Sequence, residues 1–227
     1  MGDFMNNSDK LKKISVTAML CAFAYICMFV IKFKVAFLTF DFKDAVLTVI
    51  AFLYGPLYAT VSSVLVAAVE LITVSDTGIY GFIMNALSSA VFTATCGIIY
   101  KYRRTLAGAV FGSISAVLSM TAVMLVANML ITPFYMGVGR SDVAAMIPTL
   151  LLPFNLVKGV VNAAVTMIIY MPITTALKKA GLSKTSAQKT NIKKFKIIVA
   201  ASLVLLVIAI LIILFVLNGN FSVMGKK

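Results

Sequence analysis

The chain has 227 residues, of which 62% are hydrophobic and 12% are charged, about half the charged fraction of an ordinary soluble domain. Its net charge of +13 would suit a nucleic-acid-binding protein, but the basic residues gather in short segments between long apolar runs. These runs approach the ~20 residues that span a bilayer as a helix, and no ~10-residue stretches of alternating polarity indicate a membrane β-barrel. The sequence therefore predicts a polytopic, all-α integral membrane protein with no nucleic-acid partner.

Residue types that enzymes commonly use are scarce in this chain. It contains no histidine, its three cysteines (Cys21, Cys27 and Cys96) lie inside apolar runs, and it has no G-x-x-x-x-G-K-[ST] phosphate-binding loop. We therefore expect neither a metal nor a resident cofactor, no enzymatic activity, and no ATP hydrolysis by the chain itself.

Seven apolar spans follow one another along the chain. The second has only about 11 residues, too few to cross a bilayer unaided, and Gly55-Pro56 directly after it predicts a tight turn into the third span. Neighbouring helices must shield such a short helix from lipid. The predicted spans are Ile14–Ile31, Asp44–Tyr54, Leu57–Thr73, Tyr80–Tyr100, Leu106–Ile131, Thr149–Leu177 and Ile197–Leu217.

The first six spans are predicted to form one membrane domain, residues 14–180, after a cytoplasmic N-terminal tail at 1–13. A basic segment rich in Ser and Thr, 181–196, resembles a cytoplasmic linker. It leads to an additional membrane helix at 197–217 and a C-terminal tail at 218–227. With the N-terminus inside, 13 basic residues lie on the inner side and 6 on the outer side. This bias predicts a multi-pass cell-membrane protein with a cytoplasmic N-terminus and an extracellular C-terminus.

The few strongly polar residues inside the spans lie near their predicted outer ends. Polar side chains are costly in a membrane interior and usually mark a functional pathway. The inner halves of the spans contain only hydroxyls, which can hydrogen-bond their own helix backbone. This distribution predicts a cavity that opens outward rather than a continuous channel. The residues are Glu70, Asn85, Asn128, Asn155, Lys158 and Asn162, and the last three share one helical face.

Structural roles for these residues remain open at this point. Lys158 could extend its amine to the outer headgroups, and Glu70 could pair with Lys158 or with amides at a helix end. The asparagines taken singly could join neighbouring helices. Four asparagines at a similar depth nevertheless favour a shared pocket.

Two outer loops lie over the predicted pocket. In Lys32–Asp44, Phe33, Val35, Phe37 and Thr39 alternate as in a strand, but we interpret the segment as an aromatic lid for a flat ligand. The second loop, Thr132–Pro148, is either an ordinary connector or a mobile gate.

Four motifs resemble the riboflavin-specific S components of energy-coupling-factor (ECF) transporters. They are F-L-T-F-D-F-K-D at Phe37–Asp44, Y-G-P-L-Y-A at Tyr54–Ala59, N-M-L-I-T-P-F-Y at Asn128–Tyr135 and F-N-L-V-K-G at Phe154–Gly159. The resemblance covers residues 12–180. It implies a six-helix bundle with a short second helix that binds riboflavin, as a transported ligand, near the outer surface. The seventh span departs from this six-helix pattern.

The resemblance also implies a set of ligand contacts. Asn128, Asn155 and Lys158 would contact the flavin, and the loop residues Leu38, Thr39, Phe40 and Asp41 would cap it. A carboxamide suits the pyrimidine edge of the isoalloxazine ring, because it can donate to one group and accept from the next. Glu70 would accept from ribityl hydroxyls, and Asn85 and Asn162 complete the predicted site.

Transport by this family requires partners, because an S component docks to a transmembrane coupling (T) subunit and two cytoplasmic ATPases. The resemblance assigns the docking surface to Ala18 and Ala22, an A-x-x-x-A pattern on the first span that lets a partner helix approach closely. Packing inside the protein is an equally good explanation of this pattern.

Other functions predict other sequence features. A secondary transporter that coupled Glu70 to Lys158 would show polar residues through the full depth and pseudo-symmetric broken helices, and neither is visible. A membrane enzyme would need a nucleophile–base pair or a metal cluster. Within the S components, another flat vitamin or FMN remains an alternative ligand.

Overall fold

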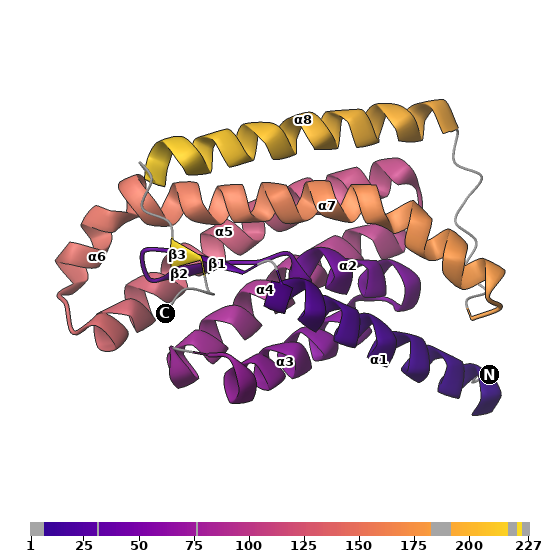
Figure 1. Cartoon of the computed structure of the whole chain (residues 1–227), viewed down its shortest axis with the longest axis horizontal. Helices are drawn as coiled ribbons and strands as arrows, with labels where there is room; N and C mark the ends of the chain where they lie inside the picture. Colours follow the sequence, from indigo (N-terminus) through magenta and orange to yellow (C-terminus); the bar gives the residue numbers. More distant parts are fainter. Residues whose placement is uncertain (1–6, 31, 76, 183–191, 218–221, 224–227) are drawn as a thin grey trace.

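The computed structural model describes residues 7–30, 32–75, 77–182, 192–217 and 222–223, which form an elongated bundle of helices (Figure 1). A π-helical turn at Ile147–Leu151 joins α6 to α7. The helices are α1 (Asn7–Val30), α2 (Lys43–Tyr54), α3 (Pro56–Thr73), α4 (Gly78–Tyr102), α5 (Leu106–Met136), α6 (Arg140–Met146), α7 (Leu152–Lys179) and α8 (Ile192–Leu217). The strands are β1 (Phe33–Val35), β2 (Leu38–Phe40) and β3 (Ser222–Val223).

Most of these helices have the length and composition of membrane spans. Within the described residues, five helical segments are long and apolar enough to cross a bilayer, and the fifth combines α6, the π-helical turn and α7. Their outer surfaces carry exposed aliphatic side chains such as Leu57 (74% exposed) and Ile72 (84% exposed), as expected of helices that face lipid rather than water. The prediction of a helical membrane protein is thereby confirmed.

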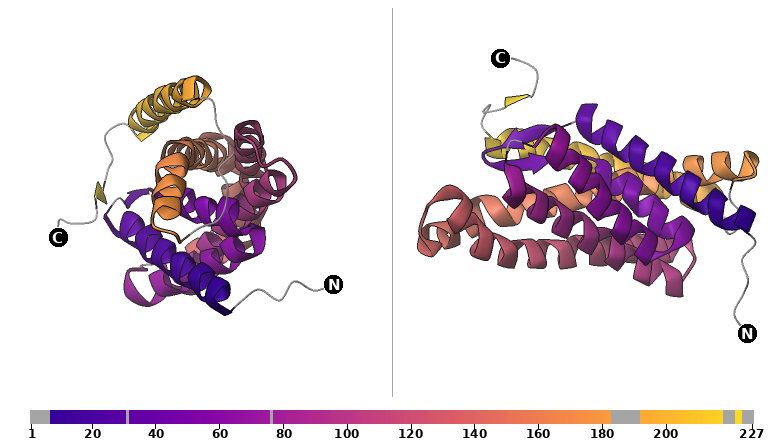
Figure 2. Two further views of the ribbon diagram at one scale, coloured as in Figure 1. Left: turned by 90° about the vertical axis from the view of Figure 1, so that its right-hand side faces the viewer. Right: turned by 90° about the horizontal axis from the view of Figure 1, so that it is seen from below.

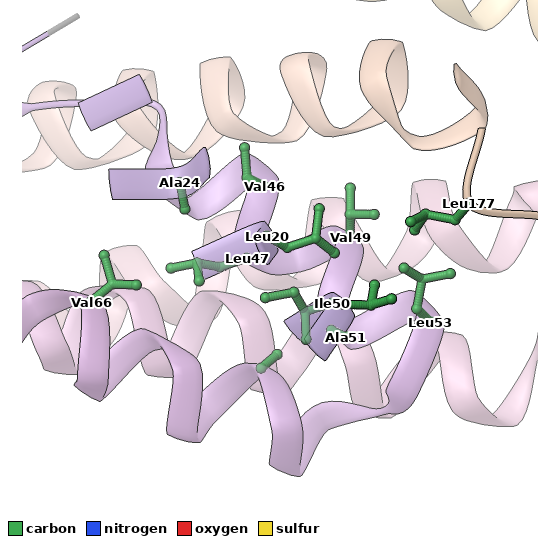
Figure 3. Packing of buried hydrophobic residues seen from close by; sticks show 12 residues of the cluster. Leu20, Ala24, Val46, Leu47, Val49, Ile50, Ala51, Leu53, Val66 and Leu177 are labelled. Carbon is green, nitrogen blue, oxygen red and sulfur yellow. The ribbon is translucent and has the colours of Figure 1, made fainter. Parts of the chain in front are cut away.

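The short helix α2 is the centre of the bundle. All of its residues from Lys43 to Leu53 are buried, because α1, α3, α4 and α7 surround it. Its Val46, Leu47 and Ile50 pack against Leu20 of α1 and Leu177 of α7 (Figure 3). This packing removes every face of α2 from lipid, as the sequence requires of a helix too short to span the membrane alone.

Two glycines allow the backbone to turn sharply and pack closely after α2. Gly55, with φ of 100°, lies in a region that L side chains rarely adopt, and Pro56 begins α3 immediately. Gly97 of α4 faces this turn: a Cβ atom there would lie 2.9 Å from the Cβ of Ala51 and 3.1 Å from the Cα of Pro56. The turn and α4 therefore approach more closely than any larger residue at position 97 permits.

The segment interpreted from sequence as a lid loop is a β-hairpin. β1 and β2 pair antiparallel, with Lys34 opposite Thr39, and the turn is made at Ala36 and Phe37. The strand-like alternation is thus confirmed, while the interpretation of the segment as a lid over a ligand stays a prediction. β3 pairs with the other edge of β1, so this small sheet has the order β2-β1-β3.

Some predicted boundaries differ from the structure. Residues 7–13, assigned to the N-terminal tail, form the first turns of α1. The apolar run from Ile14 marks the part of the helix that suits lipid, and the helix itself begins earlier with polar residues. The predicted outer loop Thr132–Pro148 is largely helical: α5 continues through Pro133 to Met136, and α6 and the π-helical turn follow. Most of the predicted linker, 183–191, and residues 218–221 and 224–227 of the predicted tail lie outside the described residues.

The last helix, α8, lies on the outside of the bundle along α7 (Figure 1). The view along the bundle shows α8 on one side and α1 on the other (Figure 2). The hairpin and α6 lie at one end of the bundle, called the hairpin end below. The first turn of α1 and the last turn of α7 lie at the opposite end.

We predict that Gly97→Ala lowers the free energy of unfolding by about 1–3 kcal/mol, because the added methyl must push α4 away from the turn after α2. Thermal unfolding in detergent measures the effect. Ile98→Val, a change at an exposed position one residue further along the same helix, is the control and should leave the unfolding midpoint nearly unchanged. Equal midpoints for wild type and Gly97→Ala would show that the close approach is not required.

Candidate ligand-binding site

A cavity lies at the hairpin end, between α4, α5, α7 and the hairpin. The space that admits the centre of a water molecule amounts to about 80 Å³. The walls combine aromatic and aliphatic side chains with a few amides and hydroxyls, a mixture typical of small-molecule sites. The lining residues are Phe37, Leu38, Thr39, Thr77, Tyr80, Gly81, Met84, Asn85, Ser88, Met124, Asn128, Ile131, Thr132, Tyr135, Phe154, Asn155 and Lys158.

Two buried asparagines present amides to this cavity from facing helices. Asn128 on α5 donates to the Met124 carbonyl (2.7 Å) and accepts from the Thr132 hydroxyl (2.9 Å). Asn155 on α7 donates to the Leu151 carbonyl (2.8 Å). These bonds fix the side chains against their own helices, yet each amide keeps a second N–H and acceptor capacity for a ligand. The arrangement suits a planar molecule with alternating donors and acceptors.

Lys158 connects the cavity wall to the hairpin. Its Nζ donates to the backbone carbonyl of Thr39 (3.4 Å) and to Oδ2 of Asp41 (3.3 Å), and the side chain is nearly fully buried. The ammonium group therefore does not extend to the headgroup region, the simplest alternative for a lysine in a span. Lys158 therefore lines the cavity and at the same time contacts Thr39 of the hairpin and Asp41 directly after it.

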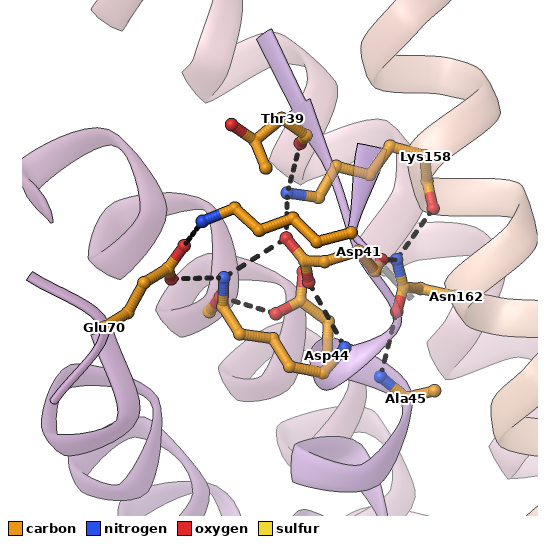
Figure 4. A network of polar contacts seen from close by, with 10 residues as sticks. Thr39, Asp41, Asp44, Ala45, Glu70, Lys158 and Asn162 are labelled. Carbon is orange, nitrogen blue, oxygen red and sulfur yellow. Dashed lines mark hydrogen bonds and ion pairs between the residues drawn. The ribbon is translucent and has the colours of Figure 1, made fainter. Parts of the chain in front are cut away.

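A chain of buried charges continues from Lys158 into the bundle (Figure 4). Asp41 also accepts from Nζ of Lys43 (3.2 Å), Lys43 reaches Glu70 (3.1 Å), and Glu70 accepts from Lys32 (2.8 Å). The chain alternates cation and anion, so each carboxylate has two ammonium partners. Because an unpaired charge is costly in a low-dielectric interior, this alternation is what allows five charged residues to be buried together.

Asp41 is the central link of this chain. Burial by itself raises the pKa of the Asp41 carboxyl, but the nearby ammonium groups of Lys158 and Lys43 outweigh burial and hold the pKa well below its ordinary value. The carboxylate also accepts from the backbone N–H of Lys43 (3.2 Å), at the first turn of α2. Asp41 thus joins the hairpin, the start of α2 and α7.

Asn162 links the same elements through hydrogen bonds. Its Oδ1 accepts from the backbone N–H of Ala45 (3.0 Å), a donor in the first turn of α2 that has no partner inside the helix. Its Nδ2 donates to the backbone carbonyls of Asp41 (3.0 Å) and Lys158 (3.1 Å). The role seen for Asn162 is to hold α2 and the hairpin against α7.

The structure divides the predicted site residues into two groups. Leu38, Thr39, Asn85, Asn128, Asn155 and Lys158 line the cavity. Phe40, Asp41, Glu70 and Asn162 lie beside the cavity instead: Phe40 packs edge-on against Phe42 and Phe154, and the other three form the polar contacts given above. Ligand contact by any of these residues stays a prediction, while Glu70 has structural partners, Lys32 and Lys43, that differ from those considered from sequence.

Several cavity residues were missed by sequence reasoning. Tyr80 and Met84 on α4, Thr132 and Tyr135 on α5, and Phe154 on α7 all line the cavity. A signal for them was present: 81, 84, 85 and 88 share one face of α4, and 124, 128, 131, 132 and 135 share one face of α5. A search of the positions that share a helical face with Asn85 and Asn128 would have found most of them.

A second, more open hollow lies between α1 and α3 on the surface of the bundle. Ala18 and Ala22 are exposed and line it together with Tyr25, opposite Tyr58 and Leu65 of α3. The two alanines therefore face outward, and packing within the protein does not account for them. Small residues on an apolar surface allow another helix to approach closely.

Comparison with known proteins identifies the relatives of this chain. A family model for the substrate-specific component of ECF transporters matches residues 12–170. Riboflavin transporter RibU of Staphylococcus aureus (strain TCH60) is 30% identical over 188 residues, covering 76% of this chain and 96% of the relative. The chain belongs to the substrate-specific components of ECF transporters.

The solved structures agree with this assignment. A structure described as the S component of a bacterial ECF transporter superposes with a TM-score of 0.64 at 27% identity, covering 74% of this chain and 99% of the other. The resemblance inferred from the four motifs is confirmed at the level of the family. S components are binding subunits that work with T and ATPase subunits, so the chain is a transport subunit and not an enzyme.

We predict that Asp41→Asn lowers the free energy of unfolding by about 3 kcal/mol at neutral pH, because it leaves Lys158 and Lys43 without their shared carboxylate. Since the folded-state pKa of Asp41 lies below that of an unfolded aspartate, its contribution is present above about pH 4 and declines as the pH falls further. Thermal unfolding in detergent between pH 7 and pH 3 should show the difference between wild type and variant shrinking at the acid end.

Asp142→Asn, at an exposed aspartate on α6 whose Oδ2 accepts from the backbone N–H of Gly139 (3.0 Å), is the control and should change stability much less than Asp41→Asn, because an asparagine oxygen can still accept this bond. Parallel profiles for wild type and Asp41→Asn over the whole range would contradict the assigned role of Asp41.

Proposed function

We propose that this S component binds riboflavin in the cavity at the hairpin end and delivers it to a T subunit and two ATPase subunits for ATP-driven import. The observation that supports the ligand most directly is the pair of amides from Asn128 and Asn155, facing one cavity with Lys158 beside them. A 30% identical relative is a riboflavin transporter, and the four motifs resemble riboflavin-specific members.

The chemistry of the cavity fits an isoalloxazine ring. Its pyrimidine edge carries carbonyl, N–H and carbonyl in sequence, which an asparagine amide and a lysine ammonium can match with donors and an acceptor. Phe37, Tyr80, Tyr135 and Phe154 supply aromatic faces and edges for a flat three-ring system. Glu70 forms ion pairs with Lys32 and Lys43. We therefore propose that Thr39 and Thr132, which line the cavity, hydrogen-bond the ribityl hydroxyls instead.

The space in the cavity that admits the centre of a water molecule, about 80 Å³, is smaller than the roughly 300–1,000 Å³ that small-molecule sites usually enclose. Binding must therefore move the lining outward. We propose that the part of the hairpin around Leu38 and Thr39 moves, because both residues line the cavity and Lys158 bonds the Thr39 carbonyl at 3.4 Å, whereas Asp41 stays fixed by Lys43 and Lys158. In this proposal, a ligand that recruits Lys158 weakens that hold and lets the hairpin reseat over the flavin.

The proposed orientation places the hairpin end outside the cell. The opposite end carries the basic residues of the first turns of α1 and of the α4–α5 connection, which favour the cytoplasmic side. In this orientation α1–α7 form the S-component bundle, and α8 is an additional membrane helix whose C-terminal end is extracellular. The exposed alanines of α1 then lie in the membrane, where a helix of the T subunit is proposed to dock in the hollow between α1 and α3.

We predict that the purified protein carries or binds riboflavin and that Asn155→Ala weakens binding about 10-fold or more, because a ligand group loses a hydrogen bond in a buried site. Lys158→Ala should weaken it at least as much. Equilibrium titration followed by quenching of flavin fluorescence measures both. Lys101→Ala, at an exposed lysine of the opposite end, is the control and should bind as wild type.

The same titration distinguishes the ligand from its alternatives. FMN and other flat vitamins are tested in parallel, and tight binding of one of them with no affinity for riboflavin would overturn the ligand while leaving the family assignment intact. Unchanged riboflavin affinity in both cavity variants would remove these residues from the site.

We predict that Ala18→Trp abolishes co-purification with T and ATPase subunits and riboflavin uptake, while riboflavin binding by the isolated subunit persists, because the bulky ring fills the hollow outside the ligand cavity. Met19→Trp, at a neighbouring exposed position that does not line the hollow, is the control and should assemble normally. Assembly of the Ala18→Trp variant at wild-type yield would place the docking surface elsewhere.

A further inference from the structure

A third cavity lies at the end of the bundle opposite the hairpin. The start of α1, the turn between α2 and α3, the end of α4 and the residues after α7 surround it, and about 670 Å³ is open to the centre of a water molecule. It is therefore much roomier than the cavity at the hairpin end, and the proposed transport function makes no use of it. We call it the basic cavity.

The basic cavity is named for its charge. Lys12, Lys101 and Arg104 line it and are exposed, and none of the three forms an ion pair within the described part of the chain. The remaining charged residues of the lining, Asp9 and Lys13, offset one another in charge. Cations from α1 and from the α4–α5 connection thus converge on one hollow with no buried carboxylate to neutralise them.

The rest of the lining is apolar and aromatic. Phe52, Leu53 and Leu57 form part of the wall, and Tyr54 and Tyr58 stand beside them with their rings 6.0 Å apart. Tyrosines are concentrated where a bilayer meets water, so this pair is expected of a cavity at the depth of the lipid headgroups. A ligand here meets ammonium and guanidinium groups on its polar part and aliphatic walls on its apolar part.

We propose that the basic cavity binds the headgroup of an anionic phospholipid of the leaflet at this end of the bundle. A phosphodiester would provide an anionic partner for Lys101 and Arg104, and the guanidinium of Arg104 can bind two phosphate oxygens at once. The acyl chains would pass Leu57 at the start of α3 and extend into the bilayer. Basic hollows at the ends of membrane helices bind such headgroups by the same chemistry.

The tendency of basic residues to lie on the cytoplasmic side explains which end carries them, but it does not require them to share a cavity. Arg103 and Lys179 lie at the same end, are exposed and do not line the basic cavity. They satisfy the topological bias equally well and therefore provide a control that separates a specific site from a diffusely charged surface.

The experiment measures lipid binding to the purified full chain by native mass spectrometry, with phosphatidylglycerol and phosphatidylcholine of identical acyl chains. We expect phosphatidylglycerol to bind preferentially, and the double variant Lys101→Gln/Arg104→Gln to lose about 10-fold or more of that affinity. The control Arg103→Gln/Lys179→Gln removes the same charge from the same end and should lose little. Thermal unfolding establishes that both double variants are folded.

Three results would overturn the inference. They are equal binding of the two lipids by wild type, equal losses in the two double variants, and displacement of phosphatidylglycerol by glycerol 3-phosphate at millimolar concentration. The last would show that the cavity takes a free phosphate compound rather than a lipid. The inference does not rest on the identity of the transported ligand, because a failure to bind riboflavin would leave the lipid preference unaffected.

Discussion

The carboxylate of Asp41, placed between the ammonium groups of Lys158 and Lys43, is the contact on which the rest of the hairpin end depends. A buried charge without a partner is costly, so without Asp41 the ammonium of Lys158 would lose its carboxylate and Lys43 would keep only Glu70. Through these two lysines one side chain holds together the hairpin, the start of α2 and α7. Glu70 extends the arrangement to α3 and to Lys32 at the beginning of the hairpin.

The same arrangement explains how a helix as short as α2 can lie in the middle of a membrane protein. Its sides are covered by four neighbouring helices, and backbone donors of its first turn are met by Asp41 and by Asn162. The side chains that accept from the first backbone N–H groups of α2 therefore come from Asp41, directly after the hairpin, and from Asn162 on α7, and both the hairpin and α7 line the cavity. Packing of the central helix and the geometry of the cavity are consequently not independent, because a shift of the hairpin acts on both.

Hydrophobic runs and the Gly55-Pro56 turn predicted the membrane fold well, since length and apolar composition leave few alternatives for a helix in lipid. The outer loops were less predictable. The segment Thr132–Pro148 was predicted as a loop, either a connector or a gate, yet α5 passes through Pro133 and is followed by another short helix. Proline tolerance near a helix end is decided by tertiary surroundings that a single sequence does not display.

For the site, depth along each span indicated polar residues that the structure brings together at the hairpin end, but it could not tell which of them face the cavity. Asn155 and Asn162 share a helical face and differ in role: Asn155 lines the cavity, whereas Asn162 contacts the backbone around α2. The partners of Glu70 were also beyond sequence reasoning, because Lys32, before the hairpin, and Lys43, at the start of α2, meet it only in the folded structure. Long-range ion pairing depends on the fold, and no local pattern encodes it.

The position of α8 gives the molecule two unlike flanks in the plane of the bilayer. It covers α7 on one side, while α1 and the hollow beside it remain open on the other (Figure 2). A subunit diffusing laterally in the membrane therefore meets the alanine surface from only part of the surrounding directions. Under the docking proposed above, association must include a rotation of the protein about the membrane normal, because the alanine surface lies on the flank that α8 leaves open, while Ala209 of α8 packs with Phe40 and Phe154 beside the cavity.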